Sequence, residues 1–155
     1  MKYQRFEDMP IWQEAGRLYQ RVLDVIEEPN VPLSPTFRNQ LERASLCISN
    51  CVAEAHAGLT IAETRSLLIS ARGAVTEVQS MVSIIVERPK VARLSDALQQ
   101  IRAGADCCCR QLVGWKFALD NPKRSQQDSS QGGGTGTVAT NAAPKPGTAA
   151  PRATG

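Results

Sequence analysis

The sequence has few aromatic residues and no long apolar run. Phe, Trp and Tyr make up 5% of the 155 residues, and alternating runs of Val, Ile, Tyr and Phe that are typical of strands do not occur. No stretch approaches the roughly 18 consecutive apolar residues that a membrane-spanning helix requires. The first ten residues, MKYQRFEDMP, are polar and lack the apolar segment of a secretory signal. We therefore expect a helical, cytoplasmic protein.

The sequence contains one histidine, which excludes most catalytic arrangements that pair a nucleophile with a histidine base. The single histidine, His56, stands alone beside a helix break, where we expect it to face solvent or cap the helix. The glycines at 132–134 have no strand before them and no helix after them, so they do not predict a phosphate-binding loop. No acidic cluster has the spacing of metal ligands. We expect no enzymatic activity and no cofactor.

Five cysteines occur, an odd number without the spacing of a disulfide framework. Cys47 and Cys51 are four residues apart, and Cys107, Cys108 and Cys109 are consecutive, so that on a helix they fan out by about 100° each. The simplest interpretation is small buried apolar side chains with a thiol or two near the surface. A metal site built from Cys47, Cys51 and one of the other three, and a redox role or intersubunit disulfide, stay open as alternatives.

Apolar residues at helical spacing predict four helices with short connections. Asp8 is the expected cap of the first helix, and Thr60 with Glu63 has the spacing of a capping box. The predicted helices cover about residues 8–28, 36–57, 60–88 and 91–119. This pattern favours an all-α fold, an antiparallel up-down four-helix bundle over residues 1–122. Residues 123–155 are rich in Gly, Ser, Thr, Ala and Pro, with Val138 the one large apolar residue, and predict a disordered C-terminal tail.

Polar residues follow a second stripe beside the apolar one on the second predicted helix. Steps of four, three and four place them on one face, with small residues between them that allow close helix packing. Arg72 and Glu77 on the next helix are candidate partners. We expect a buried polar seam that fixes the register of the two helices, formed by Arg43, Asn50, Glu54, Arg72 and Glu77.

Two further features of the third and fourth helices bear on packing. Gly73 lies inside a helix, where close approach of another helix or simple tolerance would explain it. Apolar residues also lie outside the core stripes, which predicts self-association. They are Leu67, Met81, Ile84, Val113 and Phe117.

The net charge is +3, but basic residues are concentrated late in the chain. Residues 1–87 contain 8 basic and 11 acidic residues, whereas residues 88–124 contain 8 basic and 3 acidic residues. Such an excess can neutralise phosphates without reading bases, or it can be an ordinary solvated face. The candidate nucleic-acid contacts, to phosphates of RNA or DNA, are Arg88, Lys90, Arg93, Arg102, Arg110, Lys116, Lys123 and Arg124.

The words FEDMPIWQ, QLERAS, SNCVAEA and ARGAVTE, in this order, carry a family resemblance. Over residues 6–119 the chain resembles the four-helix-bundle proteins encoded in 23S rRNA intervening sequences. That family includes the accessory variability determinant proteins of diversity-generating retroelements. The resemblance implies a homopentameric barrel with a basic outer surface and a central channel. The family usually has proline where Ser49 stands and glycine where Ala55 stands, which implies a straighter second helix here.

These observations predict a non-catalytic, homo-oligomeric nucleic-acid-binding accessory protein. By resemblance it would assist a reverse transcriptase and its template RNA in a retroelement. The alternative is a bundle protein of the rRNA type that acts as a protein–protein scaffold without binding nucleic acid. The sequence does not choose between RNA and DNA, identify the protein partner, or give the number of subunits.

Overall fold

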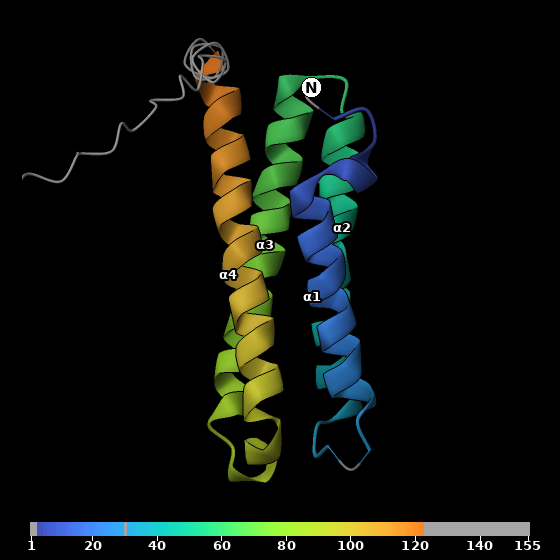
Figure 1. Ribbon diagram of the computed structural model, residues 1–155, viewed down its shortest axis with the longest axis vertical. Coiled ribbons are helices and arrows are strands. Elements are labelled where there is room, and N and C mark those ends of the chain that lie inside the picture. The colour runs from blue at the N-terminus through green and yellow to red at the C-terminus, as the bar shows by residue number, and fades with distance from the viewer. Residues whose placement is uncertain (1–2, 30, 123–155) are drawn as a thin grey trace, which may run out of the picture.

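The computed structural model describes residues 3–29 and 31–122, which form a bundle of four long helices. The helices are α1 (Pro10–Glu27), α2 (Pro35–Ala57), α3 (Ile61–Val86) and α4 (Ser95–Asp120). Two short 3-10 helices, η1 (Phe6–Asp8) and η2 (Pro89–Leu94), precede α1 and α4. Successive helices run in opposite directions, and the connections are short (Figure 1).

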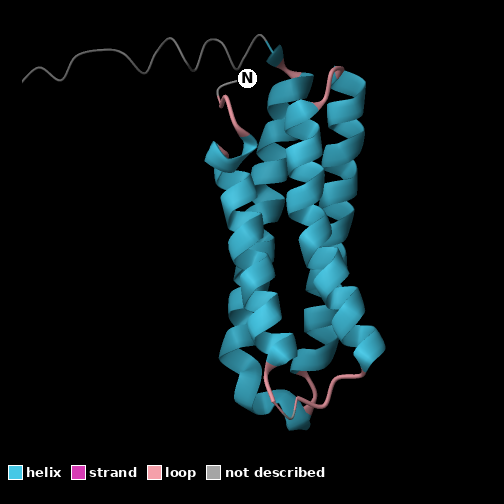
Figure 2. Cartoon of the chain, turned by 90° about the vertical axis from the view of Figure 1, so that its right-hand side faces the viewer, coloured by secondary structure: helices cyan, strands magenta, loops and turns pink. Residues whose placement is uncertain are grey.

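Each helix packs against two neighbours, α1 against α2 and α4, and α3 against α2 and α4. A second view shows the same long, narrow bundle with its connections at the two ends (Figure 2). The predicted antiparallel up-down four-helix bundle is confirmed. The predicted tail, residues 123–155, lies outside the described residues.

The helix ends follow local side-chain chemistry. Ser34 Oγ accepts a hydrogen bond from Phe37 N at 3.2 Å, and Pro35 opens α2, where its missing N–H leaves no hydrogen bond unmade. Thr60 and Glu63 form the predicted capping box at the start of α3. The cap predicted at Asp8 is wrong, because η1 takes up that residue and Met9 precedes α1 without a side-chain cap.

The start of the fourth helix also differs from the prediction. Residues from Val91 were expected to be α-helical, but the chain first makes the 3-10 turn η2 and enters α4 at Ser95. Pro89 begins this turn, and Val91 within the turn is buried. The turn thus adds an apolar residue to the end of the core before α4 begins.

The core is made by the apolar stripes that the sequence predicted, one from each helix. Its most deeply buried large side chains include Leu18, Leu41, Ile48, Leu68, Leu98, Ile101 and Leu112. Among the described residues, no helix is long and apolar enough to cross a membrane.

Candidate nucleic-acid interface

Basic residues at the α3–α4 connection hold the end of the bundle together. Arg93 Nη1 lies 2.8 Å from Glu28 Oε1, and its Nη2 donates to Pro29 O at 2.8 Å. Arg88 Nη1 donates to Pro32 O at 3.3 Å. Both arginines therefore tie η2 to the proline-rich loop between α1 and α2, which uses part of their hydrogen-bonding capacity.

Two arginines on α4 make no such contacts with the rest of the fold. Arg102 and Arg110 are exposed, and neither makes a hydrogen bond or ion pair with any residue that the structure describes. They are eight residues apart, or about 12 Å along the helix. Between them in sequence lies the half-buried Asp106, whose Oδ1 accepts a hydrogen bond from Gln79 Nε2 at 2.6 Å.

The remaining predicted contacts lie at the two ends of the molecule. Lys90 is exposed in η2 and makes no ion pair within the described part of the chain. Lys116 Nζ lies 2.8 Å from Asp120 Oδ2, near the opposite end. Figure 1 shows that η2 and the last turn of α4 lie at opposite ends of the bundle. The predicted contacts are thus spread along the length of α4, and Lys123 and Arg124 lie outside the described residues.

The polar seam predicted between the second and third helices is not buried. The side chains of Arg43, Asn50, Glu54 and Arg72 are exposed, and Glu77 is half-buried and accepts a hydrogen bond from Gln40. No ion pair joins these five residues to one another in the described chain. Helical spacing places residues on one face but does not say which face, and here Leu41 and Ile48 define the buried side of α2.

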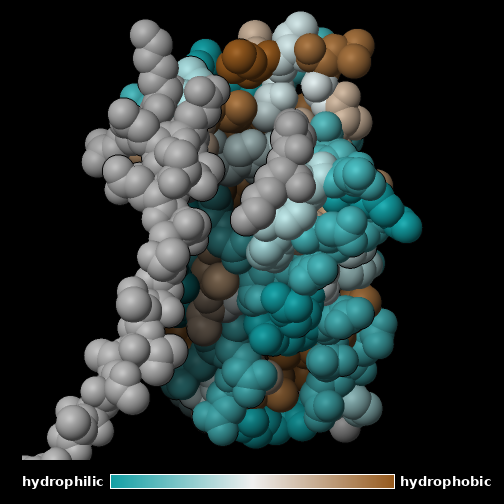
Figure 3. All heavy atoms as spheres, turned by 45° about the horizontal axis from the view of Figure 1, so that its top comes forward, coloured by the Kyte–Doolittle hydropathy of each residue, from teal (hydrophilic) through white to brown (hydrophobic). Residues whose placement is uncertain are grey.

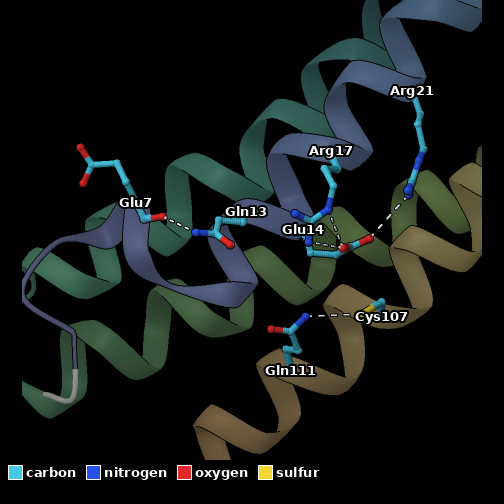
Figure 4. A network of polar contacts seen from close by, with 7 residues as sticks. All are labelled: Glu7, Gln13, Glu14, Arg17, Arg21, Cys107 and Gln111. Carbon is cyan, nitrogen blue, oxygen red and sulfur yellow. Dashed lines mark hydrogen bonds and ion pairs between the residues drawn. The ribbon is translucent and has the colours of Figure 1, made fainter.

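A half-buried ion-pair cluster does occur, but within α1, on the side that faces α4. The Glu14 side chain is 13% exposed. Its Oε2 lies 2.7 Å from Arg17 Nη2, and its Oε1 lies 3.5 Å from Arg21 Nη1 (Figure 4). Gly104 of α4 allows this arrangement, because a Cβ there would lie 2.9 Å from Arg21 Nη1. Of the two explanations that the sequence left open for Gly73, simple tolerance fits, because a Cβ there would meet no atom within 4 Å. The helical spacing of Glu14, Arg17 and Arg21 was the sequence signal for the cluster on α1.

Hydrogen bonds between side chains and backbone carbonyl groups hold the residues that precede α1. Gln13 Nε2 donates to Glu7 O at 2.9 Å and holds η1 against α1 (Figure 4). His56, predicted to face solvent or cap a helix, is half-buried, and its Nε2 lies 3.1 Å from Tyr3 O. His56 therefore holds the N-terminal segment to α2.

The cysteines are divided between two helices. Cys47 Sγ and Cys51 Sγ are 3.7 Å apart on α2, whereas Cys107, Cys108 and Cys109 lie on α4. Burial is the main cause that raises the pKa of Cys51 and of Cys108 to about 12, so both thiols stay protonated at neutral pH. In the described part of the chain, no three His, Cys, Asp or Glu side chains are grouped to hold a metal ion.

Comparison with known proteins identifies the family of the chain. No curated protein matches the chain. The family model described as 23S rRNA-intervening sequence protein matches residues 7–114, from η1 to the last third of α4. The match thus covers more than half of the chain and all four helices. The chain belongs to the family of 23S rRNA-intervening sequence proteins.

Proposed function

We propose that this protein is a non-catalytic, homo-oligomeric accessory protein that binds nucleic acid, and that it assists a reverse transcriptase and its template RNA in a diversity-generating retroelement. The resemblance of the opening words to the accessory variability determinant proteins supports the retroelement setting, and the family match supports the wider family alone. The observation that carries nucleic-acid binding is the pair Arg102 and Arg110. Both are exposed on α4 without a carboxylate partner in the described chain.

Unpaired arginines favour phosphate as a ligand. A guanidinium presents N–H donors in a fork that matches phosphate oxygens, and it stays charged at any physiological pH. An arginine already bonded to a carboxylate would have to give up that partner first. Arg102, Arg110 and Lys90 are free of partners among the described residues, so they are the strongest phosphate contacts of the predicted set. They carry no base code, so binding would depend on charge more than on sequence.

The outward face of α3 supports the oligomeric part of the proposal. Ile84 is 64% exposed, and the half-buried Leu67 and Met81 lie on the same helix. Large apolar side chains that stay exposed on a single chain can mark a contact surface for another chain. A second copy of the chain is the partner that we propose for this face, and the family resemblance suggests a pentamer.

A charge-reversal experiment tests nucleic-acid binding. The double variant Arg102→Glu/Arg110→Glu and the control Arg43→Glu are titrated into labelled single-stranded RNA and DNA, with anisotropy as the readout, over a range of salt concentrations. Arg43 is also exposed and unpaired in the described chain, but it lies on α2. We expect the double variant to bind at least tenfold more weakly than the control. Equal binding by the two variants would refute the proposed interface.

A protein–protein scaffold without nucleic-acid contact is the competing function. Exposed apolar side chains on α3 and α4 favour it, since phosphate contacts do not need them. It predicts that the purified wild-type protein retains neither RNA nor DNA at low salt, while remaining an oligomer by light scattering.

A further inference from the structure

A groove between α3 and α4 lies near the end of the bundle where α4 stops. Its volume is about 230 Å³, and its floor is formed by the buried Leu68 and Leu112. Its walls carry Ile69, Val113 and Phe117, which are 57%, 48% and 54% exposed. Figure 3 shows a mostly hydrophilic surface with apolar patches at the upper end of the molecule and also lower on the visible face. The apolar floor of the groove continues outward into apolar walls, and charged residues form its rim.

The charged residues around the groove are mostly positive. Arg65 Nη2 and Lys116 Nζ both approach Asp120, at 2.6 Å and 2.8 Å. These two cations, through hydrogen bonds first from Lys116 and then from Arg65, hold the pKa of Asp120 below its usual range. Arg72 lines the groove on the α3 side, is exposed, and has no ion-pair partner among the described residues. Three cations and one carboxylate leave an excess of positive charge beside the apolar surface.

Charge and apolar content decide which occupant fits. The residues that follow α4, 123–155, contain four basic residues and one acidic residue, with Val138 as their one large apolar residue, so they complement neither feature. A nucleic-acid strand would find Phe117 to stack on, but Ile69 and Val113 offer bases no flat partner. A chain with apolar and acidic side chains fits best, because its apolar side chains can contact the walls and its carboxylates can pair with the cations around them.

The shape of the groove favours a helix. On α3 the groove is lined by residues 68–72, about 6 Å of helix, and on α4 by residues 112–120, about 12 Å of helix. The length along α4 accepts two turns of a third helix laid along the groove, with anchors at i, i+3 or i+4, and i+7. We propose that this groove binds an amphipathic, acidic α-helix of a partner protein. Asp and Glu beside its apolar stripe would pair with Arg72 and compete with Asp120 for Arg65 and Lys116. The proposal does not depend on nucleic-acid binding.

The probe is a display library of 16-residue peptides of helical composition, because the partner is unknown. The library is selected on the purified full chain and depleted on the variant Phe117→Ser. Phe117 is half exposed, and circular dichroism checks that this variant keeps the helix content of the wild type. We expect the enriched peptides to share an apolar stripe at helical spacing and a net negative charge. No enrichment, or enriched peptides with the average charge of the library, would overturn the proposal.

The best peptide is then tested by anisotropy against charge-reversed chains. Arg72→Glu should weaken binding at least tenfold, whereas Arg43→Glu, an exposed arginine on α2, should leave it unchanged. Equal effects of the two substitutions would overturn the proposal. Two results point to another occupant and also overturn it: loss of RNA binding by Phe117→Ser without any peptide binding, and loss of the oligomer by Phe117→Ser without any peptide binding. The Arg102→Glu/Arg110→Glu variant should bind the peptide normally, which separates this test from that of nucleic-acid binding.

Discussion

Replacing Arg38 by alanine should destabilise the bundle by about 1–4 kcal/mol. This half-buried side chain closes the loop between α1 and α2. Its Nη1 donates to Ile26 O at 2.7 Å, its Nη2 to Val31 O at 2.8 Å, and its Nε to Leu33 O at 3.3 Å. Ile26 lies in the last turn of α1, where carbonyl groups have no partner within the helix. The guanidinium thus supplies hydrogen bonds that neither α1 nor the loop can make internally.

The magnitude follows from the two short bonds. A hydrogen bond from a charged donor contributes about 1.5–3 kcal/mol where water is partly excluded. Ordering an arginine side chain costs roughly 2 kcal/mol of conformational entropy, which offsets part of the gain. The long bond from Nε adds little. Arg38→Lys should lose an intermediate amount, because one ammonium group cannot reach carbonyls on three sides as a guanidinium does.

Urea unfolding followed by circular dichroism measures the effect, at one protein concentration because association would shift the apparent stability. Arg43→Ala is the matched control, since Arg43 is exposed on the same helix and should change the stability by less than about 0.5 kcal/mol. If Arg38→Ala is no more destabilised than Arg43→Ala, the loop does not depend on the guanidinium and the reasoning fails.

Two further predictions concern packing and thiols. Gly73→Ala should stabilise the fold by up to about 1 kcal/mol in urea unfolding, because a Cβ there meets no atom within 4 Å and alanine favours helix more than glycine. Destabilisation would mean instead that another chain packs on this face. Iodoacetamide at mildly alkaline pH should modify Cys51 and Cys108 more slowly than the three half-buried cysteines, because burial raises both pKa values to about 12. Peptide mapping by mass spectrometry measures this, and equal rates for all five cysteines would contradict it.

The helices could be predicted because each element carries its own signal. The stripe from Leu98 to Leu112 repeats at helical spacing, and Thr60 with Glu63 marks the start of α3 without reference to the rest of the chain. Short connections then leave few arrangements besides an antiparallel bundle.

Contacts between helices were harder to predict. The shared face of Arg43 and Glu54 was identified, but whether that face looks inward depends on the rotation of α2 about its axis, which its neighbours set. Gly73 and Gly104 both lie mid-helix, and only the position of α1 against α4 shows that Gly104 is the close approach. Arg38 was missed because its partners are carbonyl groups, which every residue of a loop possesses and no sequence motif marks.

Contacts within the fold also limit how many cations of the basic segment, residues 88–124, can bind phosphate. Among its described cations, Arg88 and Arg93 bond to the loop between α1 and α2, and Lys116 bonds to Asp120 of the same segment. The charge of the segment therefore overstates the number of free contacts. Three free cations per chain would give a slope of log K against log salt of about −2 on a single strand. Such a footprint binds weakly at physiological salt. A pentamer that presents all its copies to one strand would give a slope of about −10. In the proposed function, tight nucleic-acid binding therefore depends on self-association. A slope near −2 measured for an oligomer would show that only one chain of the oligomer contacts the strand.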